Sequence, residues 1–389
     1  MQTVYEMERG VKCSSFSTSS GVSECYFTII SSEGKTFKEA TEELALLYTD
    51  TLIENGFDET TLQFTRFYLS DIVNDFRFLK ESELFNLVKT GAVSCIQQSP
   101  VVGGQLAMLV YHIKTESNSI LIDKTSYGVH KTLTRGENYS LLWTAGSCSK
   151  SYPDSAMQTL GIFADLSMEL QKHNMSLRDN TLRTWIFVRD VDNNYQGMVN
   201  ARRELFNIVG LTSDTRYIAS TGIEGSPVDP QCLVSVDSLS YGNVKEEQIV
   251  RMEALENLNS TIQYGVTFER GLRIRFGDRS HLHISGTASI DNKGNILHTS
   301  DICKQAERTI ENIKALLSPH GASLKDMQYL IIYLRNPKHF IVVKDLLSRL
   351  IPENIPILPV QGPVCRPGWL IEMEGVAIIA DKTKFAQFL

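Results

Sequence analysis

The chain has 389 residues, 42% of them hydrophobic, and a formal net charge of −7. This length is enough for two to four domains with apolar cores, and the scattered lysines and arginines form no basic stripe of the kind that binds nucleic acids. No run of 18 apolar residues occurs and the first residues, MQTVYEMERG, contain no apolar core, so we expect neither a membrane span nor a signal peptide.

Seven cysteines without a Cys-x-x-Cys pair fit a reducing compartment better than a disulfide framework, and we therefore expect a cytoplasmic protein. His281 and His283 would share one face of a strand, but no third ligand stands nearby at zinc spacing. We therefore expect no metal site.

One pattern of elements recurs three times along the chain. Apolar residues at intervals of three and four predict helices around 38–54, 155–172 and 301–317. Each helix is followed by a break at Asn or Gly, a polar cap and an apolar strand, in segments 53–71, 171–190 and 317–336. Second helices are expected near 75–89, 194–208 and 338–350, followed by an extended segment, a Gly/Pro turn and a final strand. Each copy thus reads as β-hairpin, helix, strand, helix, strand, strand.

This order predicts an α+β fold in which each copy forms a mixed sheet with two helices on one face. Three copies can bury the remaining sheet faces against one another, as a pseudo-trimer within a single chain. We place the domains at 1–117, 118–245 and 246–389, with polar linkers at 114–119 and 242–247. The alternative explanation is that the three segments are not true repeats, because helices and strands alternate in any α/β chain. If the copies close on themselves, the protein is a monomer or weak dimer, and a stable trimer by light scattering would contradict this model.

Residues 281–380, from HISGTASI to the closing strand WLIEMEGVAI, resemble the Rid (YjgF-type) family. Members of that family are homotrimers with ligand sites between subunits, which implies that this chain is similar to a fused trimer. The common Rid activity, hydrolysis of enamines and imines, uses an Arg before the closing strand. The corresponding segments here, at 92–95, 218–221 and 356–359, contain no Arg, so the bidentate partner of a carboxylate is missing there.

A second resemblance, over roughly the last 210 residues, is to the chorismatases, which are built from Rid-like units. It is carried by RTWIFVRD (183–190), Tyr195, Arg202, STGIEG (220–225), FERG (268–271), SGTASI (285–290) and VCRPGWLIEMEG (364–375). The first 115 residues match only as a degenerate Rid-like unit. FERG departs from the Phe-Ser-Arg-Ala that the resemblance leads us to expect, which leaves the role of that loop open.

Glu372 is the candidate general acid. Chorismate is a dianionic enol ether, and releasing pyruvate from it requires an acid that protonates the methylene carbon. A carboxyl group in an apolar cleft can have its pKa raised far enough to be protonated near neutrality. The positions that we align with Glu372 in the other copies are Met108 and Ser235, so we expect one catalytic cleft and two vestigial ones.

Further residues complete the expected site, which needs no metal and no organic cofactor. Cys365 precedes Glu372 by seven residues; in the resembling enzymes a Cys here accompanies formation of 3-hydroxybenzoate, although a buried free Cys is equally consistent. Gly286 would let a ligand approach the strand backbone, and Trp369 is a core or cleft-wall residue. Candidates for binding the anion, some of which we expect to be bystanders, are Arg202, Arg270, Arg366, Tyr195 and the backbone of Thr221 and Gly222.

The leading hypothesis is therefore a chorismatase-like enzyme acting on chorismate or a related carboxylated enol ether. One alternative is a non-catalytic Rid-like protein that binds a small carboxylated metabolite, which an exposed Glu372 without a nearby arginine would favour. Another is an imine deaminase with a relocated arginine near Gly286. RNA cleavage ranks last because positive charge is not concentrated anywhere in the sequence.

Overall fold

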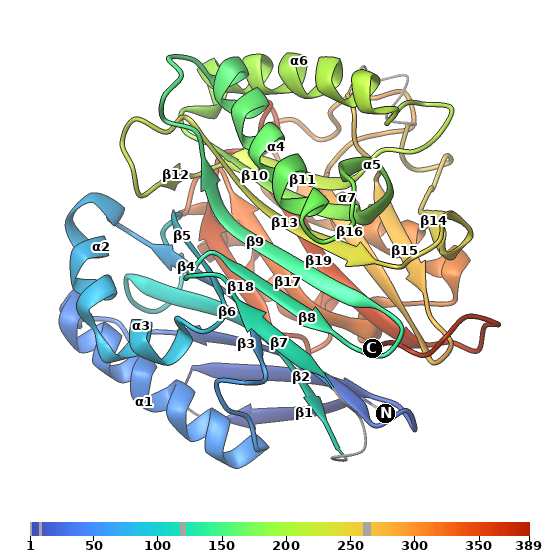
Figure 1. Ribbon diagram of the computed structural model, residues 1–389. Coiled ribbons are helices and arrows are strands. Elements are labelled where there is room, and N and C mark those ends of the chain that lie inside the picture. The colour runs from blue at the N-terminus through green and yellow to red at the C-terminus, as the bar shows by residue number, and fades with distance from the viewer. Residues whose placement is uncertain (1, 8–9, 117–121, 260–265) are drawn as a thin grey trace.

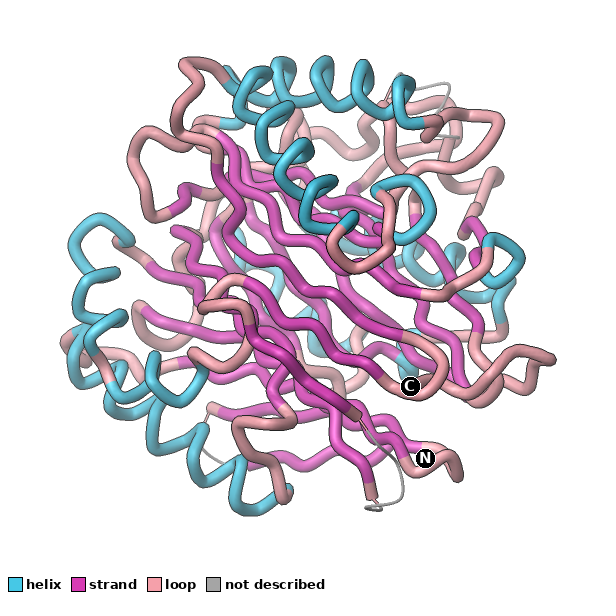
Figure 2. The backbone as a smooth tube through the Cα atoms, in the orientation of Figure 1, coloured by secondary structure: helices cyan, strands magenta, loops and turns pink. Residues whose placement is uncertain are grey.

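The computed structural model describes residues 2–7, 10–116, 122–259 and 266–389. It contains three β-sheets that meet at the centre of the molecule, with helices on the outside (Figure 1). The same separation of inner strands from outer helices is visible along the backbone trace (Figure 2). The three predicted α+β copies are confirmed, and each contributes one sheet.

The first unit has the sheet order β1-β2-β3-β6-β4-β5-β12, in which only β12 comes from the second unit. Its helices pack on one face of the sheet. The elements of this unit are β1 (Gln2–Met7), β2 (Val11–Ser17), β3 (Val22–Ile30), α1 (Phe37–Asn55), β4 (Leu62–Leu69), α2 (Ile72–Glu81), α3 (Glu83–Val88), β5 (Ala92–Gln97) and β6 (Leu106–Thr115).

The single helix expected near 75–89 is two helices in the structure. Ser82 between them is extended, with φ −81° and ψ 159°, and its side chain accepts a hydrogen bond from the amide of Phe85. The serine therefore ends α2 and caps α3, as serine commonly does at a helix N-terminus.

The second unit has the sheet order β11-β10-β13-β9-β8-β7. Its elements are β7 (Asp123–Ser126), β8 (Lys131–Arg135), β9 (Ser140–Cys148), α4 (Ser155–Gln171), α5 (Leu177–Asn180), β10 (Thr181–Val188), α6 (Val191–Val209), β11 (Ala219–Glu224), β12 (Ser226–Pro227) and β13 (Val234–Gly242).

The third unit has the sheet order β14-β15-β16-β19-β17-β18. Its elements are η1 (Glu246–Gln248), β14 (Ile249–Arg251), β15 (Gly271–Arg275), β16 (Arg279–Ala288), α7 (Ile302–Leu317), η2 (Ser318–His320), η3 (Leu324–Asp326), β17 (Met327–Leu334), α8 (His339–Leu350), β18 (Ile357–Gln361) and β19 (Ile371–Ala380). The expected boundary at 117/118 lies outside the described residues, and the domain limits stay a prediction.

The strand registers align the three units residue by residue. In each unit the closing strand (β6, β13 or β19) pairs antiparallel with β4, β10 or β17, and that strand pairs parallel with β5, β11 or β18. Tyr333 pairs with Glu372, Phe187 with Ser235, and Tyr68 with Ala107. The first-unit equivalent of Glu372 is thus Ala107, one residue before the expected Met108, and neither of the other units has a carboxyl group at this position.

The inner faces of the three sheets share one apolar core. Phe64 stacks on Trp143 at 4.4 Å between ring centres, Trp143 stacks on Trp185 at 5.6 Å, and Tyr26 lies 5.3 Å from Tyr329. These contacts join all three units. Aromatic rings stabilise such interfaces because they bury large areas and pack well in offset arrangements.

Buried ion pairs also link the units. Arg66 of the first unit binds Asp237 of the second at 2.7 Å, and Arg183 of the second binds Glu374 of the third at 2.5 Å. Arg279 of the third unit binds Glu24 of the first at 2.8 Å. All six side chains are fully buried, so each of the three interfaces contains one desolvated arginine–carboxylate pair.

Each unit also extends a segment onto the edge strand of another. Pro227 pairs with Ile96 of β5, Val364 with Ile223 of β11, and Pro100 with Val360 of β18. The second unit thus reaches the first, the third reaches the second, and the first reaches the third. This cyclic arrangement closes the predicted pseudo-trimer. In the described part of the chain no helix is both long and apolar enough to cross a bilayer.

Candidate active site

A cavity of about 330 Å³ lies between the second and third units. The second unit supplies one wall from α6 and β11, and the third unit supplies the rest from β16, β19 and the loops before β15 and β19. Its lining residues are Tyr195, Gln196, Val199, Arg202, Arg203, Ser220, Gly222, Val266, Phe268, Arg270, Gly286, Ala288, Ile290, Cys365, Arg366, Trp369 and Glu372. The cavity contains every residue predicted for the site except Thr221.

Glu372 lies on β19 with only 5% of its surface exposed, and its Oε1 atom has no hydrogen-bond partner among the described residues. Burial raises its pKa to about 8, with a further contribution from the charge of Glu374, while Arg270 and Arg183 act in the opposite direction. Desolvation disfavours the charged carboxylate. Glu372 is therefore mostly protonated at neutral pH.

Glu374, two residues further along the same face of β19, has different surroundings. Its Oε2 atom accepts hydrogen bonds from Arg183 Nη2 at 2.5 Å and Trp185 Nε1 at 3.0 Å, and its Oε1 accepts one from the Tyr333 hydroxyl at 3.3 Å. Hydrogen bonds between a guanidinium and a carboxylate are among the stronger ones in proteins. The two carboxyl groups thus differ in role: Glu374 joins the units, and Glu372 is available as an acid.

Glycine at position 286 leaves the space that the Glu372 side chain occupies. A Cβ atom added to Gly286 would lie 2.9 Å from Glu372 Cδ, closer still to its Oε1, and 3.3 Å from Thr221 Cγ2. Gly222 is similar, because an added Cβ would lie 3.0 Å from the ring of Tyr195. Both glycines permit close packing around the cavity.

Four arginines line the cavity and, with Glu372, are its charged lining residues within the described chain: Arg202, Arg203, Arg270 and Arg366. Arg202, on α6, is 2% exposed and donates from Nε to Thr267 Oγ1 at 3.1 Å and from Nη1 to Ser220 Oγ at 3.3 Å. Arg270 donates from Nη2 to Asn259 Oδ1 at 2.8 Å. Since the one carboxyl group is protonated, the cavity is electropositive and suits an anion.

Cys365 and Tyr195 both line the cavity, from opposite sides of the boundary between the units, and each influences the pKa of the other. Burial, with a contribution from Glu372, raises the pKa of the Cys365 thiol to about 12. Burial also raises the pKa of Tyr195 well above its ordinary value. Both groups are therefore neutral at physiological pH and can act as hydrogen-bond donors, but the thiol is no ready nucleophile.

The remaining predicted residues take supporting positions. Thr221 lies behind the cavity wall, where its Oγ1 accepts from Arg183 Nη2 at 2.7 Å. Arg366 lies with its guanidinium 5.3 Å from the ring centre of Trp369, and the indole of Trp369 donates to the Ser289 carbonyl at 3.0 Å. Trp369 is thus a cleft wall, one of the two roles expected for it.

Sequence reasoning did not single out Arg203, Val199 or Phe268. Arg203 and Val199 could have been found from Tyr195 and Arg202, because helical periodicity places residues three, four and seven positions apart on one side of α6. Phe268 belongs to the FERG motif, but its place in the cavity could not be predicted, since it lies in an irregular segment whose path depends on contacts with the second unit.

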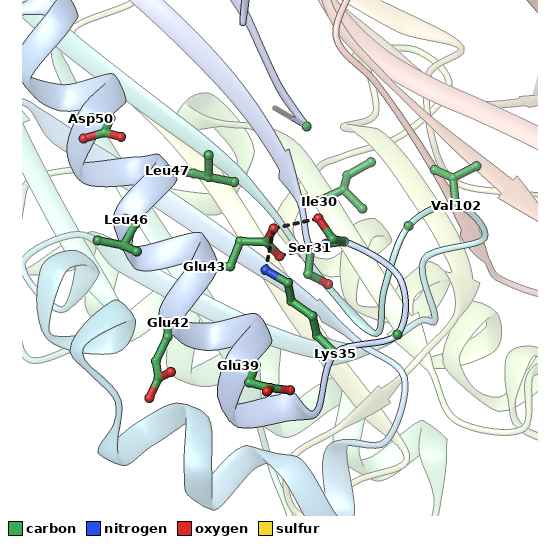
Figure 3. Close-up of a pocket in the computed structure, with 14 residues that line it drawn as sticks. Ile30, Ser31, Lys35, Glu39, Glu42, Glu43, Leu46, Leu47, Asp50 and Val102 are labelled. Atoms are coloured by element: carbon green, nitrogen blue, oxygen red, sulfur yellow. Dashed lines mark hydrogen bonds and ion pairs between the residues drawn. The ribbon is translucent and has the colours of Figure 1, made fainter. Parts of the chain in front are cut away.

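A larger hollow, of about 1040 Å³, lies beside α1 in the first unit (Figure 3). It is lined by Glu39, Glu42, Glu43 and Asp50, and the Lys35 ammonium lies 2.9 Å from Glu43. Hydrogen bonds from Ser32 and Lys35, although partly offset by desolvation, lower the pKa of Glu43. Hydrogen bonds from Thr36 lower the pKa of Glu39 as well, so neither of these two carboxyl groups is suited to act as a general acid.

Comparisons with known proteins match separate parts of the chain. A model of the Endoribonuclease L-PSP family matches residues 274–379. The 3-aminoacrylate deaminase RutC of Acinetobacter baylyi is 31% identical over 97 residues, which are 25% of this chain and 77% of the deaminase. A RutC family protein of Pyrococcus abyssi is 33% identical over 97 residues, 25% of this chain and 76% of that protein.

Two comparisons extend beyond the third unit. The 3-hydroxybenzoate synthase of Streptomyces hygroscopicus is 25% identical over 222 residues, which are 51% of this chain and 64% of the synthase. A crystal structure of chorismatase superimposes with a TM-score of 0.63 at 15% identity, covering 90% of this chain and 98% of that one. At this identity the superposition shows a common fold.

Proposed function

Because the chain belongs to the Rid (L-PSP) family and has the fold of chorismatase, we propose that it cleaves chorismate, or a related carboxylated enol ether, to pyruvate and a cyclic carboxylate. The observation that carries this proposal is the pairing of a buried, protonated Glu372 with four arginines in one cavity. An acid protonates the enol ether, and the cations hold a substrate with two carboxylates. The volume lies at the lower end of small-molecule sites, as a single-ring substrate requires.

The reaction begins when Glu372 transfers its proton to the methylene carbon of the enolpyruvyl group. The ether carbon becomes cationic, and the former C=C electron pair forms the new C–H bond. The Glu372 carboxylate left behind stabilises this cation, and nearby arginines keep the substrate carboxylates in place. The groups that surround this cation in the cavity then determine which of two steps completes the reaction.

Two completions balance. Addition of water at the ether carbon gives a hemiketal that breaks down to pyruvate and a dihydroxycyclohexadiene carboxylate. Alternatively the bond between the ring carbon and the ether oxygen breaks, its electron pair stays on the oxygen, which becomes the keto oxygen of pyruvate, and the ring loses a proton to the Glu372 carboxylate; this aromatisation consumes no water and gives a hydroxybenzoate. The similarity to a 3-hydroxybenzoate synthase and the presence of Cys365 beside Glu372 support the second completion for this chain.

Two alternatives are less well supported. A non-catalytic binding protein would not require a carboxyl group that is 5% exposed and shares its cavity with arginines. An imine deaminase with a relocated arginine is favoured by one observation, because Arg270 lines the same cavity as Gly286. A parallel assay with 2-aminoacrylate, following ammonia release, distinguishes that activity from chorismate cleavage.

The test is to incubate the purified protein, its Glu372→Gln variant and a Glu353→Gln control with chorismate. Pyruvate is followed enzymatically and ring products by chromatography. We expect wild type and control to release pyruvate, and Glu372→Gln to lose at least about a hundredfold in rate, as expected when a general acid is removed. Glu353 is exposed and does not line the cavity. Equal rates in all three proteins would remove Glu372 from the mechanism, and no pyruvate from the wild type would refute the proposal.

The same chromatograms test the product. We expect a hydroxybenzoate from the wild type and a shift toward the dihydroxycyclohexadiene carboxylate in Cys365→Ala. An unchanged product ratio in that variant would show that Cys365 is only a packing residue.

A further inference from the structure

Residues 267–270 form a short strap that crosses from the third unit onto the second. Phe268 and Arg270 of the strap line the cavity, while Glu269 between them does not. Glu269 is 6% exposed, and its Oε1 atom accepts a hydrogen bond from the backbone amide of Tyr217 at 2.7 Å. The same oxygen lies 3.6 Å from Arg251 Nε. A carboxylate of the third unit thus binds the backbone of the second, next to the site.

The backbone of Glu269 is held from both sides. Its amide donates to the Ile218 carbonyl at 3.1 Å, and its carbonyl accepts from Ser285 Oγ at 2.6 Å. Ser285 in turn accepts from the amide of Ser220 at 2.9 Å and donates its own amide to the Arg270 carbonyl at 3.1 Å. The strap is therefore fixed to β11 and to β16 at once.

These contacts determine where the Arg270 side chain begins. Its guanidinium reaches the cavity over Asn259, with Nη2 to Asn259 Oδ1 at 2.8 Å and Nε to the Asn259 carbonyl at 3.4 Å. Movement of the strap away from β11 would shift Arg270 Cα and with it the guanidinium. Phe268 would move as well, because it lies on the other side of Glu269.

We propose that Glu269 is a positioning residue: by binding the Tyr217 amide it holds the strap on β11 and so keeps Arg270 where it can bind a substrate carboxylate. This inference relies on the proposed function only for the identity of the substrate. Glu269 acts through Arg270 and has no part in proton transfer, so it affects substrate affinity more than the chemical step. Glu269 is also one of the two residues, with Gly271, at which FERG departs from Phe-Ser-Arg-Ala.

A double-mutant cycle separates this role from a general structural one. The variants are Glu269→Ala, Arg270→Ala and the pair, with Glu269→Gln as the conservative change, because its amide oxygen can still accept from Tyr217. We expect Glu269→Ala to raise KM for chorismate about tenfold, the size of one charge-assisted hydrogen bond, while kcat falls less than about threefold. In the Arg270→Ala background, Glu269→Ala should raise KM less than about twofold. The KM of Glu269→Gln should stay within about threefold of the wild-type value.

The control is Glu253→Ala, which removes an exposed carboxylate that also interacts electrostatically with Glu269 but lies outside the strap. It should leave KM unchanged. Equal KM effects of Glu269→Ala with and without Arg270, or a loss confined to kcat, would overturn the inference.

A crystal structure of Glu269→Ala decides the inference even if the wild type does not turn over chorismate, a result that would refute only the proposed function. We expect the strap to have left β11 and Arg270 to have left Asn259. An unchanged strap with Arg270 in place would show that Glu269 has no positioning role. Should the alanine variant fail to fold, Glu269→Met takes its place in both measurements, because it keeps the length of the side chain but cannot accept from the Tyr217 amide.

Discussion

Glu372 and Glu374 stand two residues apart on one strand, and their surroundings differ. Arg183, Trp185 and Tyr333 all donate to Glu374, whereas Glu372 is desolvated beside that negative charge. Placing two carboxyl groups close together is an effective way to keep one of them protonated. The same pattern distinguishes acid from stabilising carboxylate in other carboxyl-based sites.

The raised pKa of Glu372 has a measurable consequence for the pH dependence of the reaction. The protonated form is the active acid, so kcat/KM should be level below pH 8 and fall as pH rises through about 8, the pKa in the free enzyme. A bound dianion disfavours a further negative charge, so the fall in kcat should lie at higher pH than the fall in kcat/KM. A pH profile in constant ionic strength buffers measures both.

Activity that instead declines from about pH 5 upward would show that Glu372 has an ordinary pKa and would contradict this assignment. The Glu372→Gln variant is the control, since any residual activity in it should lack the fall near pH 8.

At the residue level, the candidate site was chosen largely through resemblance. Eight of the nine proposed residues line one cavity, and Thr221 stands directly behind it. The protonation states could be anticipated only in outline, because they depend on partners distant in the sequence: Arg183 and Glu374 are 191 positions apart. Phe268 and the function of Glu269 could not be predicted, since both depend on contacts between units.

At the scale of elements, the pairing of β16 with β19 contains a bulge. The register shifts between Ile284 and Thr287, so that Ser285 and Gly286 together oppose Glu374. The second unit has the same shift between β9 and β13, whereas β3 and β6 pair without interruption. Bulges of this kind redirect neighbouring side chains, and here the bulge brings Gly286 against the carboxyl group of Glu372.

A methyl group at this bulge should disable the site. In Gly286→Ala the new Cβ would overlap the Glu372 carboxyl group, and the side chain must move by about an ångström. A displacement of that size can cost on the order of a hundredfold in rate. We expect this loss in chorismate turnover, with a melting temperature close to that of the wild type by calorimetry. Full activity would show that Glu372 works equally well from another position.

Helices were predicted more accurately than their interruptions. The first long helix of each unit, α1, α4 or α7, begins and ends within about one residue of the expected positions, because apolar spacing and caps are local signals. The break at Ser82 was missed since a serine between two polar residues also occurs within continuous helices. The bulge at Gly286 was not predicted either, as register is a property of two strands.

At the scale of the whole molecule, three fully buried ion pairs join the units in a ring. The repeat in the sequence predicted three similar units, but it could not show how they face one another. The paired residues are 171, 191 and 255 positions apart. Because an unpaired buried charge is costly, such pairs favour one relative arrangement of the units over others.

Asp237→Asn tests this arrangement away from the proposed active site. It leaves Arg66 buried without its counter-charge, so the free energy of unfolding should fall by about 3–5 kcal/mol. Replacing both residues, as Arg66→Met with Asp237→Leu, should cost far less, because no charge then stays buried. Denaturant unfolding curves measure both. A loss below about 1 kcal/mol in Asp237→Asn would show that the pair does not secure the interface.

The cyclic contacts between the units have one further consequence. In an assembly of identical subunits, every substitution is repeated at each symmetry-related position, so a change that improves one binding site alters all of them. Here each interface is encoded once, by its own stretch of the gene. Selection could therefore refine the interface that holds Glu372 while Ser235 and Ala107 drifted at the equivalent positions. The same independence would let an engineer introduce a second acid at position 235 without changing the first site.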